Sequence, residues 1–387
     1  MRSHHPKAKR HQDNRERKSL RNAEVAESTS KTALVLGGGA PNSALMAGAL
    51  AAFEEQGVKF DVVSTSGAGG LVGLLWLSPK DATPVEALRN WVGSYVSDEI
   101  YNAFPVDYKV FFKPGTTADL YRTMLNNWPP YQALVNQAGD TPWQRLWSDW
   151  TQLMTATLSP TSLNMSDPGL CARVPWADQL VDFSKVKDIA PYFYLNAYNV
   201  TAEMMDDFSK SEITLDHFKA AFAFPFIYGP YKMGDSYYYE GASHDCLNFK
   251  DLVEKHTGLE TIVVFDVLGS ETLIRTPRDL YDSWVLSMII PLVKVAEDNL
   301  ELFALKHNHG WRRSEGARSD LLVMPFDIPE QDLDKVLDWS HSNGQRLFDI
   351  GYRSALDFLN GEGAVLKRGQ AAKAPKRGKA KELAEVE

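Results

Sequence analysis

The chain has 387 residues, of which 44% are hydrophobic and 24% are charged, and its net charge is −9. This is the composition of an ordinary globular protein. Two cysteines, Cys171 and Cys246, are too few for a disulfide framework and indicate a reducing compartment. The N-terminus lacks the apolar core of a secretory signal, and the most apolar stretch is too short to span a bilayer, so we expect a cytoplasmic protein.

Both ends of the chain are basic, although the chain as a whole is acidic. Residues 1–22 hold eight Lys or Arg against two acidic residues, and residues 367–387 hold seven against three. Neither end has the apolar residues that a packed core requires, so we predict disordered arms over 1–30 and 363–387. Such arms attach a protein to an anionic membrane surface or simply keep it in solution. No recognition module accompanies them, so we expect no specific nucleic-acid partner.

The first predicted strand, 32–36, runs directly into a glycine-rich loop. The glycines are Gly37, Gly38 and Gly39, and a helix over 43–56 is predicted to follow them. Glycines before a helix leave backbone N–H groups that can point at one anion, and the helix dipole adds positive potential. The loop is therefore a candidate oxyanion hole.

A glycine-rich turn of this kind is also typical of dinucleotide-binding domains. Their motif requires a third glycine where this chain has Asn42. It also requires an acidic residue at the end of the second strand, whereas Asp61 lies at its start. The sequence therefore favours an oxyanion hole over a nucleotide site.

The second predicted strand, 60–64, ends at a serine among small residues. The run is Ser-Thr-Ser-Gly-Ala with Ser66 at its centre, and a helix over 67–77 follows. Such a turn is typical of a nucleophile elbow, which exposes the serine hydroxyl at the end of the sheet. Ser64 and Ala68 stand where the usual motif has glycines, so the match is to a relaxed form. We predict that Ser66 is the nucleophile.

Residues 98–182 differ in composition from the rest of the chain. They contain half of the ten tryptophans and many prolines. Trp143, Trp147 and Trp150 fall on one helical face, which predicts a Trp-rich helical insertion. Such a stripe either packs against the main domain or forms a lid that binds acyl chains.

Strands and helices alternate along the remaining chain, which indicates one α/β domain over 31–362. The other predicted elements are strands over 192–200, 260–268 and 320–325, a hairpin around 234–235, and helices over 84–97, 277–306 and 329–359.

Together with a third motif, the glycine-rich loop and the serine turn resemble the patatin-like phospholipases. The third motif is Glu240-Gly241-Ala242, which stands where that family has Asp-Gly-Gly or Asp-Gly-Ala. The segments 194–201 and 220–226 are also similar to family segments. The resemblance covers about 32–359 and implies a layered α/β fold with a central, mostly parallel sheet flanked by helices.

The resemblance implies a lipid acyl hydrolase that acts on a lipid or acyl-ester substrate, without a metal or an organic cofactor. Ser66 would attack the ester carbonyl, Glu240 would accept its proton, and the glycine-rich loop would hold the oxyanion. His244 and Asp245 are the nearest alternative bases. The glutamate is one methylene longer than the family's aspartate. A non-catalytic lipid-binding or scaffold protein, and a hydrolase of storage polyesters or thioesters, remain open alternatives.

Overall fold

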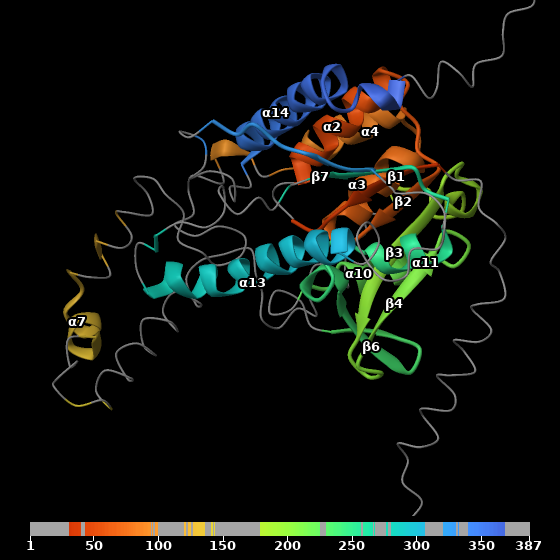
Figure 1. Ribbon diagram of the computed structural model, residues 1–387. Helices are drawn as coiled ribbons and strands as arrows, with labels where there is room; N and C mark the ends of the chain where they lie inside the picture. Colours follow the sequence, from red (N-terminus) through yellow and green to blue (C-terminus); the bar gives the residue numbers. More distant parts are fainter. Residues whose placement is uncertain are drawn as a thin grey trace, which may run out of the picture.

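A computed structural model gives the arrangement of the chain (Figure 1). It describes residues 31–39, 43–93, 179–224, 230–256, 258–265, 280–305, 320–329 and 340–367, together with short pieces and single residues between them. The predicted arm over 1–30 lies outside the described residues, as do Trp147, Trp150 and most of the predicted insertion. Within that insertion, Trp128 and Trp143 are exposed, and α7 spans Pro129–Val135.

The core of the protein is one mixed sheet of eight strands. Seven strands follow the order β5-β6-β3-β2-β1-β7-β8, and β4 pairs with β3 off this path. The five central and edge strands β3, β2, β1, β7 and β8 are parallel, whereas β4, β5 and β6 pair antiparallel. The bounds are β1 Thr32–Leu36, β2 Val62–Thr65, β3 Tyr192–Asn199, β4 Met204–Ser209, β5 Tyr231–Met233, β6 Ser236–Glu240, β7 Thr261–Phe265 and β8 Asp320–Met324.

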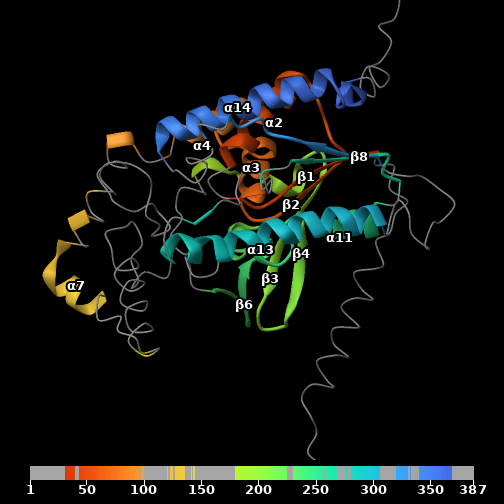
Figure 2. The ribbon, with the colours of Figure 1, turned by 60° about the vertical axis from the view of Figure 1, so that its left-hand side comes forward.

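Helices cover both faces of this sheet, so the domain has three layers (Figures 1 and 2). The first face is covered by α2, α3, α4 and α14, whose apolar residues form one cluster with Leu34 and Leu36 of β1. The second face is covered by α11 and α13, which pack against Ala33 and Val35. The bounds are α2 Ser43–Glu55, α3 Ala68–Leu77, α4 Pro84–Gly93, α10 Leu215–Ala221, α11 Phe249–Lys255, α13 Leu280–Phe303 and α14 His341–Asn360.

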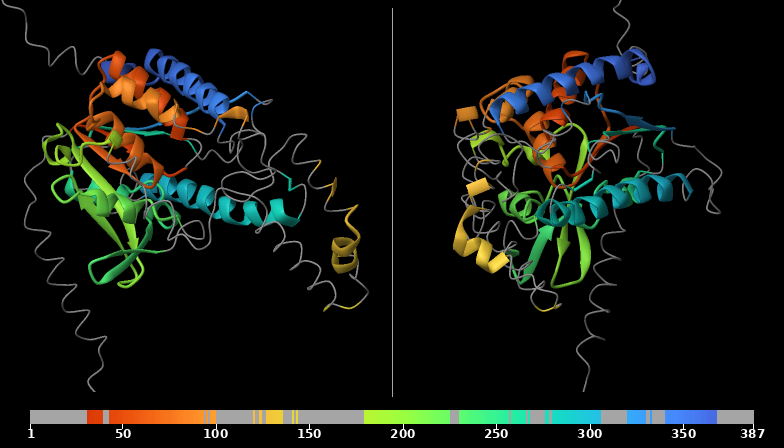
Figure 3. Two further views of the ribbon diagram at one scale, coloured as in Figure 1. Left: turned by 180° about the vertical axis from the view of Figure 1, so that it is seen from behind. Right: turned by 90° about the vertical axis from the view of Figure 1, so that its left-hand side faces the viewer.

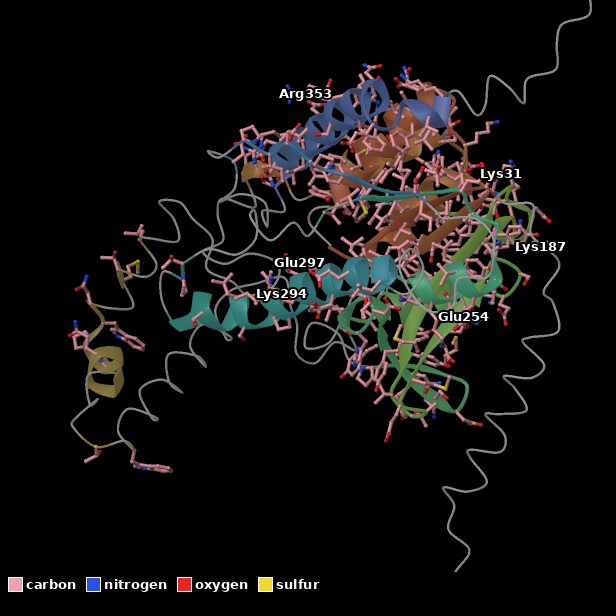
Figure 4. All side chains as sticks on the ribbon, in the orientation of Figure 1. Lys31, Lys187, Glu254, Lys294, Glu297 and Arg353 are labelled. Carbon is pink, nitrogen blue, oxygen red and sulfur yellow. The ribbon has the colours of Figure 1, made fainter. Side chains whose placement is uncertain are left out.

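Helix α13 is a long amphipathic helix that packs on the second face of the sheet. Ala296 and Phe303 pack into the cluster of the second face, whereas Lys294 and Glu297 form an ion pair on its outer side (Figure 4). Views from behind and from the side show the antiparallel strands β4 and β6 extending beyond the helices, away from α14 (Figure 3). Among the described helices, none is both long and apolar enough to cross a membrane.

The predicted α/β fold class, a mostly parallel sheet flanked by helices, is confirmed. Boundaries moved by a few residues: the second strand is 62–65 rather than 60–64, and the helix after it begins at 68. The predicted C-terminal arm begins too early, because residues 364–367 are helical and Leu366 is 4% exposed. The packed domain therefore extends beyond the predicted limit of 362.

Candidate active site

The pairing register of β3 brings the serine turn and Glu240 together. Strand β2 pairs with the first half of β3 and ends with Thr65 opposite Leu195. Strand β6 runs toward β2 along the same edge and ends with Glu240 opposite Ala197. The ends of β2 and β6 therefore meet at Asn196, the one residue of β3 between these two pairs. Segments that lie about 170 residues apart in the sequence become direct neighbours.

The residue with a strained backbone in the turn after β2 is Gly67, which directly follows the predicted nucleophile Ser66. Gly67 has φ +50° and ψ −124°, a conformation that L-residues rarely adopt. Ser66 is not among the described residues with positive φ. Its N–H still donates to Leu36 O at 3.0 Å, in continuation of the strand ladder. In a nucleophile elbow the reacting residue is the strained one, so position 67 has that geometry here.

A close contact of Gly69 supports an alignment of the motif that is centred on Gly67. A Cβ on Gly69 would lie 2.1 Å from Leu36 O, so a glycine is required there. In the Gly-x-Ser-x-Gly pattern the second glycine follows the nucleophile by two residues. The run Thr-Ser-Gly-Ala-Gly over 65–69 therefore also fits the spacing of this pattern, with Gly67 at its centre.

The Ser66 side chain is directed into the protein. It is fully buried, and its hydroxyl lies 2.7 Å from Asn196 Oδ1 and 2.9 Å from the backbone oxygen of Asp245, to either of which it donates. Asn196 Nδ2 donates to the same backbone oxygen at 2.9 Å. These contacts join the residue after β2 to the middle of β3 and to the segment after β6.

The Glu240 carboxylate lies directly against Gly67. A Cβ built on Gly67 would be 1.9 Å from Glu240 Oε1 and 2.9 Å from its Cδ. Glu240 is 6% exposed. Its N–H donates to Ala223 O at 2.9 Å, and its backbone oxygen accepts from Ser243 Oγ at 2.7 Å. The structure therefore places this acid beside the strained residue of the turn.

The glycine-rich loop packs against the segment that follows Glu240. Gly38 N–H donates to Cys246 O at 3.3 Å, and a Cβ on Gly38 would lie 2.5 Å from the Ala242 Cβ. Gly37 is buried against Leu247 and Cys246. Gly39 is half-buried, with φ +130°. Gly39 is thus the most exposed of the three loop glycines.

The nearest alternative bases have other surroundings. The His244 ring stacks on Tyr198 with centroids 3.6 Å apart, and desolvation lowers the pKa of this histidine. The Asp245 carboxylate accepts from Asn248 N–H at 3.0 Å and from Asn299 Nδ2 at 3.1 Å, although burial raises its pKa. Burial also raises the pKa of the Cys246 thiol to about 12, so that thiol is not a ready nucleophile.

Beneath the turn, Asn248 fixes the end of β2. It has φ +48°, and its Nδ2 lies 3.2 Å from Thr65 O and 3.1 Å from Asp207 Oδ1. The backbone oxygen of Asn248 accepts from Ser64 Oγ at 2.7 Å. Among the described side chains, no group of three or more His, Cys, Asp or Glu is placed to hold a metal ion.

Comparison with known families agrees with this arrangement. A family model described as patatin-like phospholipase matches residues 34–253. The chain belongs to the patatin-like phospholipase family. The matched region of the patatin-like chain contains the glycine-rich loop, the turn after β2 and Glu240.

The solved structures that match this chain have low sequence identity to it. VipD from Legionella pneumophila is 13% identical, with 86% of this chain and 67% of VipD covered and a TM-score of 0.35. Human GIVD cytosolic phospholipase A2 is 11% identical, with 89% and 60% covered and a TM-score of 0.40. The type III effector protein ExoU is 15% identical, with 87% and 53% covered and a TM-score of 0.30. The chain thus spans 60% of the human protein and 53% of ExoU. No curated protein matches its sequence.

Proposed function

We propose that the chain is a lipid acyl-ester hydrolase in which Glu240 is the catalytic base. The observation that carries the proposal is the contact between the Glu240 carboxylate and Gly67, the strained residue of the elbow. A base must lie within hydrogen-bond reach of the proton it removes. At this position, Glu240 is next to the point where a patatin-type nucleophile would act.

Backbone N–H groups at the start of α3 supply the electrostatic part of the proposal. Gly69 and Gly70 donate to Ser66 O and Gly67 O, respectively. The first N–H groups of a helix have no partner within the helix, and its dipole makes this end positive. We therefore assign the oxyanion to the N–H groups of Ala68 and Gly39. This assignment keeps one of the three predicted loop glycines in contact with the ligand and gives Gly37 and Gly38 a packing role.

Turnover of an ester panel by the full-length chain tests the proposal. The panel contains a phospholipid, a monoacyl ester, an acyl thioester and a hydroxyalkanoate oligomer, because the family does not fix the head group. Glu240→Gln is expected to lower kcat by about 10²–10⁴-fold, since an amide cannot accept the proton. The exposed Glu254→Gln, on α11, is the matched control and should keep the wild-type rate. Absence of turnover on every ester would overturn the proposal.

A specific observation favours a second candidate, a non-catalytic lipid-binding protein. The strained residue of the elbow is a glycine and carries no hydroxyl. A protein of this kind would bind acyl lipids on vesicles or in solution but release no fatty acid from any ester. Binding without release, measured on the same lipid, would favour this function over hydrolysis.

We also propose peripheral attachment to anionic membranes through the two basic ends of the chain. The support is their charge, eight basic against two acidic residues over 1–22 and seven against three over 367–387. Each basic residue near an anionic surface contributes about 1 kcal/mol to binding.

A further inference from the structure

We infer that the nucleophile of this site is a water molecule held by Glu240 beside Gly67, and that Ser66 forms no covalent intermediate. The inference rests on the proposed hydrolase function and specifies its chemistry. The chain would then hydrolyse esters by direct attack of water, whereas the elbow of this fold ordinarily carries a residue that forms an acyl-enzyme.

The elbow of the turn after β2 is centred on Gly67. Gly67 has the strained conformation, and the close contact of Gly69 with Leu36 O fixes the frame of the motif. A side chain that reaches the substrate from this turn must start at residue 67. Because residue 67 is glycine, the polypeptide offers no hydroxyl there.

The neighbouring hydroxyl groups are engaged within the protein. Ser64 Oγ donates to Asn248 O at 2.7 Å, and Thr65 Oγ1 donates to Tyr194 O at 2.8 Å. Ser66 Oγ donates to Asn196 Oδ1 or Asp245 O, and the residue is fully buried. Each of these hydroxyls is bonded within the protein, and all three lie in β2 or directly after it. Moving Ser66 toward a substrate would leave buried Asn196 without that donor, which is costly.

The Glu240 carboxylate fits against Gly67. The Oε1 atom lies 1.9 Å from the position that a Cβ on residue 67 would take, so the two side chains cannot occupy the site together. Glutamate is one methylene longer than the aspartate of the family. This extra length places the Glu240 carboxylate in the space that a side chain on residue 67 would occupy. A water molecule hydrogen-bonded to Oε1 lies about 2.8 Å from it. Such a water takes the place of the absent nucleophile.

The reaction then proceeds without an acyl-enzyme. Glu240 removes a proton from the water while the water oxygen attacks the carbonyl carbon, and the carbonyl oxygen becomes an oxyanion held by backbone N–H groups. The bond from this carbon to the leaving oxygen breaks as Glu240 gives the proton to the leaving alkoxide. The products are one carboxylic acid and one alcohol, and Glu240 is a carboxylate again.

Active-site labelling during turnover tests the inference. The wild-type chain is incubated with a fluorophosphonate probe, and separately with the best ester of the panel, and its intact mass is measured after acid quenching. We expect hydrolysis with neither probe labelling nor an acyl adduct. Ser66→Ala removes a buried hydrogen bond to Asn196 or Asp245 and should lower stability, but it should keep kcat within about tenfold, because this hydroxyl does not reach the substrate. Glu240→Gln should lose about 10²–10⁴-fold. A probe or acyl group on Ser66 would overturn the inference and leave the proposed hydrolase function intact.

A double substitution tests whether residue 67 is the nucleophile position by placing a hydroxyl there. Gly67→Ser combined with Glu240→Asp restores a hydroxyl at residue 67 and shortens the acid to make room for it. We expect this double variant, and not the wild type, to react with the probe at position 67. Gly67→Ser alone should not react, because the longer acid occupies the space of the new Cβ. Failure of the folded double variant to react would contradict the assignment of position 67.

Different results would contradict the hydrolase function and the water nucleophile. If the wild type binds lipids but hydrolyses none of the esters, the proposed function itself is wrong and the water mechanism falls with it. If the wild type hydrolyses an ester and Ser66→Ala abolishes turnover together with probe labelling, only the water mechanism is wrong.

Discussion

Asn196 organises the site at the scale of single residues. It is fully buried, it accepts the Ser66 hydroxyl through Oδ1, and it donates to Asp245 O through Nδ2. A Cβ on Gly241 would lie 2.2 Å from Asn196 Oδ1, so the glycine after Glu240 is required by this amide. One side chain of β3 thus fixes the directions in which both the turn after β2 and the end of β6 leave the sheet.

Asp207 gives a prediction about pH and stability. Its Oδ1 accepts from Asn248, but its Oδ2 is removed from solvent and has no hydrogen-bond partner among the described residues. Burial, followed by the neighbouring Asp251 carboxylate, raises the pKa of Asp207 well above its ordinary value. A raised folded-state pKa contributes stability below the ordinary value near 3.9, and this contribution is lost as pH rises through the folded-state pKa.

We therefore expect Asp207→Asn to be more stable than the wild type at pH 8, by about 1–3 kcal/mol, and close to it at pH 4. Urea unfolding at both values measures the difference. The exposed Asp320→Asn serves as the control and should show no such trend. An effect of Asp207→Asn that is equal at the two pH values would contradict the assigned titration.

The sequence indicates which segments form the candidate site, but it does not fix the register of the turn after β2. The loop glycines, the turn after β2 and Glu240 stand out in the sequence by their local composition, and the structure brings these segments together. The run Ser-Thr-Ser-Gly-Ala-Gly contains two overlapping partial matches to the motif, centred on Ser66 and on Gly67, and the sequence alone does not choose between them. The contact of Gly69 with Leu36 O distinguishes them, and that contact is visible only in three dimensions.

At the scale of elements, the crossing of α2 and α14 gives a second prediction. A Cβ on Gly48 would lie 1.9 Å from Phe348 O, so the two helices approach closely only because residue 48 has no side chain. Gly48→Ala is expected to lower the free energy of unfolding by about 1–3 kcal/mol or more through overpacking. Gly93→Ala, near the end of α4, meets no atom within 4 Å and should be neutral or stabilising by up to about 1 kcal/mol. Urea unfolding compares the two, and equal effects would contradict the close-contact argument.

The elements that sequence reasoning found are those with a strong hydrophobic pattern. Strands β1, β2 and β7 are buried on both faces and read as apolar or β-branched runs. Strand β4 was missed because Met-Met-Asp-Asp-Phe-Ser has neither an apolar run nor clear alternation. Its two aspartates belong to polar contacts with Asn199 and Asn248, which come from other segments.

At the scale of the whole molecule, the layered sheet explains how three short motifs can form one site. These motifs are the glycine-rich loop, the turn after β2 and the segment of Glu240. The loop after β1 and the turn after β2 both leave the carboxyl ends of adjacent parallel strands, where ligands of open α/β sheets bind. The antiparallel strand β6 reaches the same place from the other direction. The site is therefore assembled from segments that the sheet holds in register, and the register is set by the buried faces of the strands.

The charge of the whole chain gives the last prediction. The net charge is −9 although both ends are basic, so the part between them is more acidic than the whole. An anionic membrane should repel that part, and attachment should depend on the ends. Deleting 1–22 together with 368–387 is expected to abolish most binding to vesicles rich in phosphatidylserine. Exposed charges are screened over about 8 Å at physiological ionic strength, so added salt should release the intact chain.

Vesicle co-sedimentation across a salt series measures both effects, with neutral phosphatidylcholine vesicles as the control. Neither end contains a residue of the proposed site, so turnover of a small soluble ester should be the same in both forms. Equal vesicle binding by the intact and shortened chains would contradict attachment through the ends. Attachment would then have to come from apolar contacts, which added salt does not weaken, and the exposed Trp128 and Trp143 would be the first residues to replace.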